Sequence, residues 1–240
     1  MTLFGRPFQP RLWPTLIALP TFVVLLGLGA WQLVRLEEKQ ALIAEIEARM
    51  AAPPMPLPAD LSDPALEFRR VDLVGHFLHE RELYLPGKTY KGTYGQWVAT
   101  PFVLRDGRTV IVNRGWVPEK YYKPESRREG LLAGEVTVQG IIRLPGWQGW
   151  DSARPDNAPA ANVWYYFDLP AMAAAAGLEN PVTEVHVEAL GDESTGLLPI
   201  GLDRRVELPN DHLQYAITWF ALAAVLLAIY FAFHLRRPTS

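Results

Sequence analysis

Two long apolar runs, residues 12–34 and 212–235, dominate the hydrophobic pattern of the chain. Each is about 23 residues long, enough at about 1.5 Å per residue to cross the roughly 30 Å hydrocarbon layer of a membrane. Neither run contains Lys, Arg, Asp or Glu. The pattern therefore predicts two transmembrane helices. A cleaved signal peptide is the alternative for the first run, but the run is longer than a signal core.

The first predicted helix continues beyond the membrane. Leu36, Ile43, Ile46 and Met50 recur at helical spacing after the apolar run. The segment PPMPLP, residues 53–58, then stops any helix, because proline lacks the backbone N–H and clashes with the preceding turn. The sequence thus predicts one continuous helix that leaves the membrane and ends before this proline-rich linker.

Between the two runs lie about 175 residues, the size of one ordinary domain. Short stretches rich in β-branched and aromatic residues, separated by turn residues, predict an antiparallel sheet or barrel. Asp168, Pro170 and Gly177 predict the cap, first turn and end of one short helix. The predicted strands are residues 68–77, 81–86, 95–104, 108–118, 135–144, 163–169 and 182–190.

The fold class predicted from these patterns is an α+β membrane protein, in which two transmembrane helices flank an antiparallel β-rich soluble domain. Basic residues flank both ends of the two runs equally, so charge alone does not orient the chain. The predicted segments are a tail (1–11), transmembrane helix 1 (12–34), a helical extension with a proline-rich linker (35–58), the β-rich domain (59–211), transmembrane helix 2 (212–235) and a second tail (236–240).

Composition narrows the function classes. The net charge is −3, which argues against a general nucleic-acid binder, and the 49 % hydrophobic content argues against a disordered chain. The chain has no cysteine, which excludes disulfides, thiolate metal sites and cysteine nucleophiles. No nucleophile elbow or paired-carboxylate spacing appears, so nothing positive indicates an enzyme.

Several motifs have a simple structural interpretation. The sequence GKT at residues 87–89 lacks the earlier glycine of a phosphate-binding loop, because that position is Glu82; a flexible loop between strands is the better interpretation. His76 and His79 are three apart, so on one strand they point to opposite faces and form a poor metal site. His186 alternates with glutamates, which predicts a solvated histidine.

Two further sets of side chains have more than one interpretation. His234, at the end of the second run, is expected at the membrane interface. Trp147 and Trp150 lie in a predicted loop, where they close the core, touch the membrane interface or mark a partner site; core closure is the simplest expectation.

One group of side chains gathers where the two predicted helices meet the same membrane face. The group consists of His212, Tyr215 and Trp219 on the second helix and Trp31, Gln32 and Arg35 on the first. One interpretation is an ordinary aromatic belt with an interfacial histidine. The other is a haem site, in which His212 ligates the iron, aromatic faces pack against the macrocycle, and arginines pair with propionates. Arg204 and Arg205 are the further candidate propionate partners.

Four segments resemble the Surfeit locus protein 1 family. They are LPNDHLQYAITWFALA (208–223), VATPF (98–102), VNRGWVP (112–118) and GAWQLVRL (29–36), and the resemblance covers essentially the whole chain. Phe167 departs from the family pattern, which often has a basic residue there, so an anion contact at that strand end is in doubt. VNRGWVP is a structural or docking element, in which Asn113 and Arg114 order the turn before Trp116.

The resemblance implies a non-enzymatic assembly factor for haem–copper terminal oxidase, the cytochrome c oxidase. It implies that the protein binds haem a transiently and aids its insertion into oxidase subunit I, with His212 as the iron ligand and haem a synthase as a further partner. It also implies a bacterial or mitochondrial inner membrane; the short N-terminal tail lacks the composition of a transit peptide, which favours the bacterial one. The β-rich domain would then be periplasmic and both tails cytoplasmic.

Two alternatives come from other functional classes. A protein-interaction scaffold would hold oxidase subunits together without binding haem. A membrane-tethered periplasmic enzyme would need a polar pocket in the β-rich domain. The absorption spectrum of the purified protein separates the haem carrier from the scaffold.

Overall fold

The computed structural model describes residues 2–3, 6–147, 149–191, 197–202 and 210–235. The chain divides into two compact units, one formed by Met1–Glu45 with Glu207–Ser240 and the other by Ile46–Val206. We call these the helical unit and the β domain, and each is described by itself.

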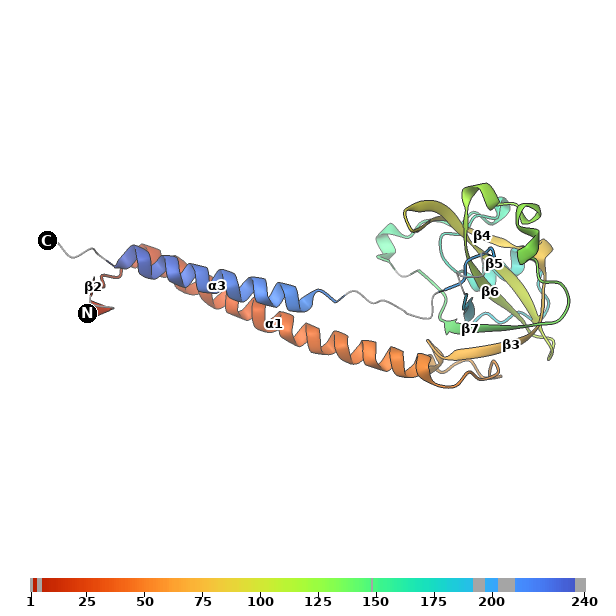
Figure 1. Cartoon of the computed structure of the whole chain (residues 1–240), viewed down its shortest axis with the longest axis horizontal. Helices are drawn as coiled ribbons and strands as arrows, with labels where there is room; N and C mark the ends of the chain where they lie inside the picture. The colour runs from red at the N-terminus through yellow and green to blue at the C-terminus, as the bar shows by residue number, and fades with distance from the viewer. Residues whose placement is uncertain (1, 4–5, 148, 192–196, 203–209, 236–240) are drawn as a thin grey trace. The chain divides into compact units, whose positions relative to one another are not determined.

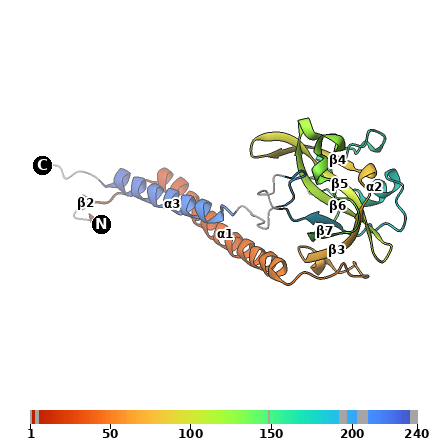
Figure 2. The same ribbon diagram turned by 45° about the vertical axis from the view of Figure 1, so that its right-hand side comes forward.

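In the helical unit, α1 (Leu12–Ala51) and α3 (His212–His234) lie side by side (Figures 1 and 2). Both helices are long and apolar enough to cross a membrane. The helix α1 is continuous and ends just before Pro53, which confirms the predicted extension and its stop. Two strands of two residues each, β1 (Thr2–Leu3) and β2 (Arg6–Pro7), precede α1 and were not predicted.

The β domain is built on one six-stranded sheet. Its order is β3-β7-β8-β6-β5-β4, and β3 also pairs with β5, so five of the strands close into a barrel with β4 attached outside. The strands are β3 (Arg70–Phe77), β4 (Leu83–Tyr90), β5 (Thr93–Leu104), β6 (Thr109–Pro118), β7 (Val136–Arg143) and β8 (His186–Ala189).

The predicted antiparallel pairing holds for every pair in this sheet except β6 with β8, which is parallel. The reason is the connection between β7 and β8, which runs across the outer surface and brings β8 in between β7 and β6. The strands β6 and β7 run in opposite directions. Because β8 is antiparallel to β7, it therefore runs in the same direction as β6. The sheet is therefore mixed.

Hydrophobic side chains fill both sides of the sheet. The barrel interior holds a cluster that includes Val71, Leu73, Phe102 and Val187. A second cluster on the outer face packs under the short helix α2 (Leu169–Ala175). As predicted, Asp168 caps α2 and accepts a hydrogen bond from the backbone N–H of Ala171 (3.3 Å).

The segment 163–169 is not the strand that its aromatic pattern predicts. It forms only isolated bridges, with Val163 opposite Tyr84 and Phe167 opposite Gly146. Its apolar residues instead cover the outer face of the sheet, where Trp164 is fully buried. Alternation of apolar residues therefore indicated burial correctly but not the backbone pairing.

Candidate functional site at the helix pair

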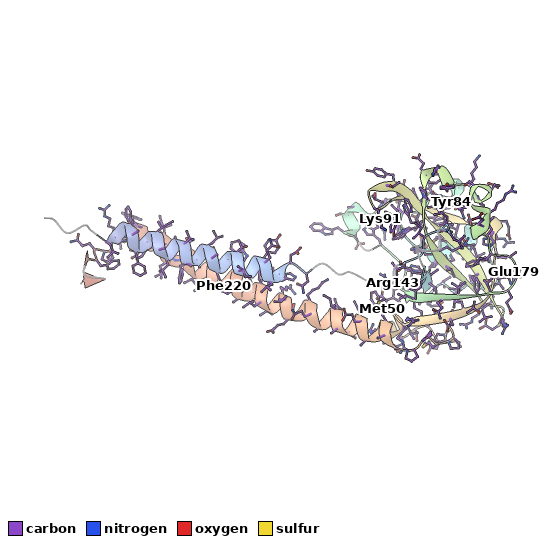
Figure 3. All side chains as sticks on the ribbon, viewed as in Figure 1. Met50, Tyr84, Lys91, Arg143, Glu179 and Phe220 are labelled. Carbon is purple, nitrogen blue, oxygen red and sulfur yellow. The ribbon has the colours of Figure 1, made fainter. Side chains whose placement is uncertain are left out.

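The antiparallel pairing of α1 and α3 brings the predicted site residues on the two helices to the same height along the helix pair. Near one end of the pair, the Thr15 hydroxyl lies 2.8 Å from the Tyr230 hydroxyl. Near the other, Gly29 lies against the ring of Phe220, which is labelled in Figure 3, and a Cβ at Gly29 would come within 2.7 Å of that ring. Ala216 and Ala223 are also buried. Small residues let the two backbones approach closely, as in membrane helix pairs generally.

His212 and Gln32 form the polar centre of this end. His212 is the first residue of α3 and is half-buried, whereas Gln32 is buried on α1. The ring Nδ1 of His212 lies 2.7 Å from Oε1 of Gln32. Because an amide oxygen only accepts, Nδ1–H donates this bond and the lone pair stays on Nε2. The contact therefore fixes the tautomer in which Nε2 can act as a ligand or acceptor.

Aromatic and basic side chains surround this level. Trp31 is 50 % exposed and Tyr215 is 55 % exposed, while Trp219 is half-buried one turn further along α3. The guanidinium of Arg35 lies 5.6 Å from the ring centre of Trp31 and forms an exposed ion pair with Glu38 (2.7 Å). Such a pair contributes little, so Arg35 can change partners at small cost.

The structure thus brings His212 to Gln32 and Trp31 to Arg35, as the predicted group requires. Tyr215 and Trp219 follow His212 along α3, and both leave ring surface accessible. The two further propionate candidates, Arg204 and Arg205, lie outside the described residues. Sequence reasoning named Gln32 but missed its bond to His212, and it missed the small residues Gly29, Ala216 and Ala223, which several other small residues on the same helices do not single out.

Comparisons with known proteins identify the family of the chain. The SURF1 family model matches residues 19–224. Surfeit locus protein 1 of Rattus norvegicus is 40 % identical over 227 residues, covering 88 % of this chain and 72 % of the rat protein. The human Surfeit locus protein 1 is 38 % identical over 231 residues, covering 89 % and 75 %. The chain belongs to the SURF1 family.

A more distant animal relative supports the same assignment. The SURF1-like protein of Drosophila melanogaster is 37 % identical over 219 residues, covering 82 % of this chain and 70 % of the fly protein. SURF1 family proteins are generally assembly factors for cytochrome c oxidase and not enzymes. The resemblance found in the sequence is therefore confirmed at the level of the family.

The SURF1 family motif VNRGWVP forms most of β6 and contains a bulge. Asn113 pairs with Ala99 and Gly115 with Val98, so Arg114 is the extra residue. The side chain of Asn113 accepts a hydrogen bond from the N–H of Gly115 (3.1 Å), as predicted for ordering this turn. Gly115 has φ +111°, and a Cβ there would strike the backbone of Ile200. The bulge thus requires glycine.

Arg114 does not order the turn, which corrects the prediction for this residue. Its side chain enters a buried ionic cluster, where it lies 3.7 Å from Glu82 and donates to the carbonyl of Gly130. The carboxylate of Glu82 also accepts hydrogen bonds from both terminal nitrogens of Arg127. The side chains of this pair are each 1 % exposed. Burial lowers the pKa of Arg114 to about 10. No sequence pattern connected these residues.

The two histidines of the His-x-x-His spacing, His76 and His79, have different surroundings in the structure. The ring of His79 contacts the carbonyl of Leu132 (2.9 Å) and the guanidinium of Arg114 (3.4 Å), whereas His76 is exposed. Burial is the main reason why the pKa of His79 is lowered. Within the described ranges, no group of three His, Cys, Asp or Glu side chains is arranged to hold a metal ion.

His186 is buried rather than solvated, contrary to the prediction. Its ring stacks on Phe167 with centroids 3.8 Å apart, and burial lowers its pKa to about 3. Glu188, on the same face of β8, is also buried and pairs with Arg143 (3.3 Å). The prediction was wrong because the segment 163–169 covers this face of the sheet, which local alternation cannot reveal. Phe167 therefore packs against an imidazole.

Two other expectations also change. Trp150 is 84 % exposed, so core closure is wrong for this residue, although its carbonyl accepts a hydrogen bond from the Trp147 indole (3.0 Å). The GKT segment lies within β4 and pairs with β5, so it is part of a β-ribbon rather than the predicted flexible loop. A phosphate-binding loop would instead lead into a helix.

Proposed function

We propose that this protein assists assembly of the haem–copper terminal oxidase, cytochrome c oxidase, by holding haem a at the outer membrane face and aiding its insertion into subunit I. Membership of the SURF1 family supports the assembly role. The observation that carries the haem proposal is the Gln32–His212 hydrogen bond, because it directs the lone pair of His212 to Nε2. Ligating histidines generally donate their other ring N–H to a fixed acceptor in this way.

The residues present fit a haem. The imidazole of His212 is a suitable axial ligand, and bound haem a would supply an iron centre whose ligands the protein can exchange with those of the oxidase. The exposed rings of Trp31 and Tyr215 offer apolar surface to a flat macrocycle. Arg35 lies where α1 leaves the membrane. Its guanidinium can pair with a propionate in place of Glu38. A single histidine suits a protein that must release its ligand.

The two candidate membrane spans support a location in a membrane. We place the protein in the bacterial inner membrane with its β domain in the periplasm, and we name oxidase subunit I and haem a synthase as its partners. The orientation has a direct test because the chain has no cysteine. A single cysteine at exposed Glu179 should react with a membrane-impermeant maleimide added to intact spheroplasts. Reaction only after lysis would place the β domain in the cytoplasm and contradict this orientation.

The haem proposal is tested by the absorption spectrum of the full chain purified in mild detergent from cells that make haem a. We expect a Soret band and a red haem a band, both lost or shifted in His212→Ala. His234→Ala is the matched control, because it removes the other histidine of α3 and should leave the spectrum unchanged. Gln32→Leu should weaken haem retention while keeping the ligand.

Two outcomes would contradict the proposal in different ways. If the wild-type protein and all variants carry no chromophore, the haem carrier is wrong and the scaffold that only holds oxidase subunits is favoured. If the band is present and unchanged in His212→Ala, the carrier stands and the ligand assignment is wrong. Oxidase activity of cells that produce each variant shows whether assembly itself depends on His212.

A further inference from the structure

The hairpin between β4 and β5 projects as a two-stranded ribbon. Beyond Gly95, which pairs with Pro118, β5 has no further pairing with β6, while its pairing with β4 continues through Thr89 with Tyr94 and Tyr90 with Thr93. Figures 1 and 2 both show this ribbon extending away from the rest of the β domain. A two-stranded ribbon alone is at best marginally stable in water, so this one needs support from the domain.

Trp116 of the VNRGWVP motif supplies that support. Its indole N–H donates to the carbonyl of Lys88 (3.1 Å), and its ring lies 5.3 Å from the ring of Tyr90. The indole also lies against Gly95, where a Cβ would come within 2.6 Å of Cε2 of Trp116. These contacts hold the ribbon from Gly95 at its base to Tyr90 in its last pair. The ribbon is therefore presented as a structured arm rather than as a loose loop.

The surface of the arm combines positive charge with aromatic rings. Residues 83–95 include two lysines and no acidic residue. The ammonium of Lys88 lies 4.2 Å from the ring centre of Trp97, and that of Lys91 lies 5.5 Å from the ring centre of Tyr90. Tyr94 is 74 % exposed at the end of the ribbon. Tyr94 therefore takes no part in the core of the domain.

One further lysine beside an aromatic ring lies next to the arm, adjacent to the exposed Glu119. Lys120 follows β6, and its ammonium lies 4.7 Å from the ring centre of Tyr121. Because Pro118 pairs with Gly95, Lys120 lies two residues along the chain from the base of the ribbon. Lysines beside tyrosine and tryptophan rings are the combination that membrane–water interfaces favour, since the rings enter the headgroup layer and the cations meet phosphates.

We propose that this arm, residues 86–95, docks on anionic phospholipid headgroups. The two spans keep a membrane surface at high effective concentration for the rest of the chain, so even a weak contact is populated. The positive charge of the arm complements an anionic lipid surface, and its exposed tyrosine matches the interfacial layer. The proposal is independent of haem binding and adds a lipid contact to the β domain.

The test uses the full chain in lipid nanodiscs with one introduced cysteine carrying a fluorophore. Thr93→Cys places the probe at the end of the arm. Glu179→Cys is the control, because Figure 3 shows Glu179 and Lys91 at opposite ends of the β domain. The quencher is a phospholipid with a nitroxide in its headgroup, in discs with and without phosphatidylglycerol.

We expect quenching at Thr93→Cys to be about twofold or more stronger in discs with phosphatidylglycerol, to fall at high salt, and to stay weak at Glu179→Cys. The added pair Lys88→Gln and Lys91→Gln should reduce it to the level of neutral discs. Should this pair alter folding, the comparison of lipids with the unmodified arm still decides the question.

Equal quenching in neutral and anionic discs would overturn the proposal. So would equal quenching at the two probe positions. If the probe at Thr93→Cys is shielded only when oxidase subunits are added, the arm docks on a protein instead. The lipid proposal is then also wrong.

Discussion

The two units of this protein bury polar side chains in opposite ways. In the helical unit, one polar contact joins the buried, uncharged amide of Gln32 to the half-buried ring of His212. In the β domain the buried polar contact is an ionic cluster of Glu82 with Arg127 and Arg114. The environment explains the difference, because a charge within a lipid layer is costly, whereas a water-soluble domain can surround a buried ion pair with further hydrogen bonds.

The difference also separates function from stability. Arg127 uses all three guanidinium nitrogens, two on Glu82 and Nε on the carbonyl of Tyr121 (3.2 Å). The cluster therefore joins Glu82, the residue before β4, to the segment 124–130, and Arg127 has no guanidinium nitrogen left for a ligand. The contact with Gln32 occupies Nδ1 of His212 and leaves Nε2 for a ligand. A buried polar contact in which every hydrogen-bonding group already has a partner is thus identified as structural.

The largest effect is expected from breaking the ionic cluster. Glu82→Gln leaves Arg127 and Arg114 buried without their counterion, which should cost about 3–5 kcal/mol in the free energy of unfolding of the β domain. Denaturant unfolding followed by tryptophan fluorescence measures the loss. The control Glu135→Gln removes the exposed partner of Arg105 and should leave stability unchanged. Equal effects of the two substitutions would show that burial does not distinguish these ion pairs.

A smaller effect is expected in the helical unit. Gly29→Leu forces a side chain into the ring of Phe220, and overpacking of this kind typically costs about 1–3 kcal/mol. Gly27→Leu is the matched control, because a Cβ at Gly27 meets no atom within 4 Å. Oxidative crosslinking of the double variant Thr15→Cys with Tyr230→Cys reports the pairing of α1 and α3. Similar crosslinking in both glycine variants would contradict the close contact.

The smallest effect comes from lowering the pH by one unit below 6.5. Burial lowers the pKa of His186 to about 3, below its usual 6.5, so the unfolded chain binds a proton that the folded domain does not. Stability should therefore fall as the pH drops from 6.5 towards 3, by about 1.4 kcal/mol at one unit below 6.5.

Glu188 opposes this trend, because burial raises its pKa and the folded state then holds a proton longer. Its contribution decreases as the pH rises through the range above 4.5. The difference between wild type and His186→Gln isolates the histidine, since glutamine does not titrate. Parallel pH curves for the two proteins would show that His186 binds its proton equally well in the folded and unfolded chains, so that burial does not lower its pKa.

The sequence predicted what local pattern determines. Apolar runs gave both helices, Pro53 marked the end of α1, and Asp168 marked the start of α2. The helix pair was also predictable, because two antiparallel spans place His212 and Gln32 near one level. The family assignment came from short motifs along the whole chain.

What the sequence did not predict depends on contacts between distant segments. Glu82 and Arg127 are 45 residues apart and lie on different elements, so no spacing rule connects them. His186 alternates with glutamates as a solvated residue would, yet Phe167 covers it from another segment. Only the position of the connection between β7 and β8 decides that this face is buried.

The closed order of the strands has a consequence for how other proteins can recognise the β domain. Five strands have neighbours on both sides, and the outer side of β4 is partly occupied by Val163 and by the N–H of Trp164 bonded to the carbonyl of Tyr84 (3.0 Å). The remaining part of β4 carries a bulge after Pro86. Strand addition to an open edge, a common way for proteins to associate and to aggregate, is therefore disfavoured along this sheet. Recognition of the domain then relies on its loops and side chains, which can change without disturbing the barrel.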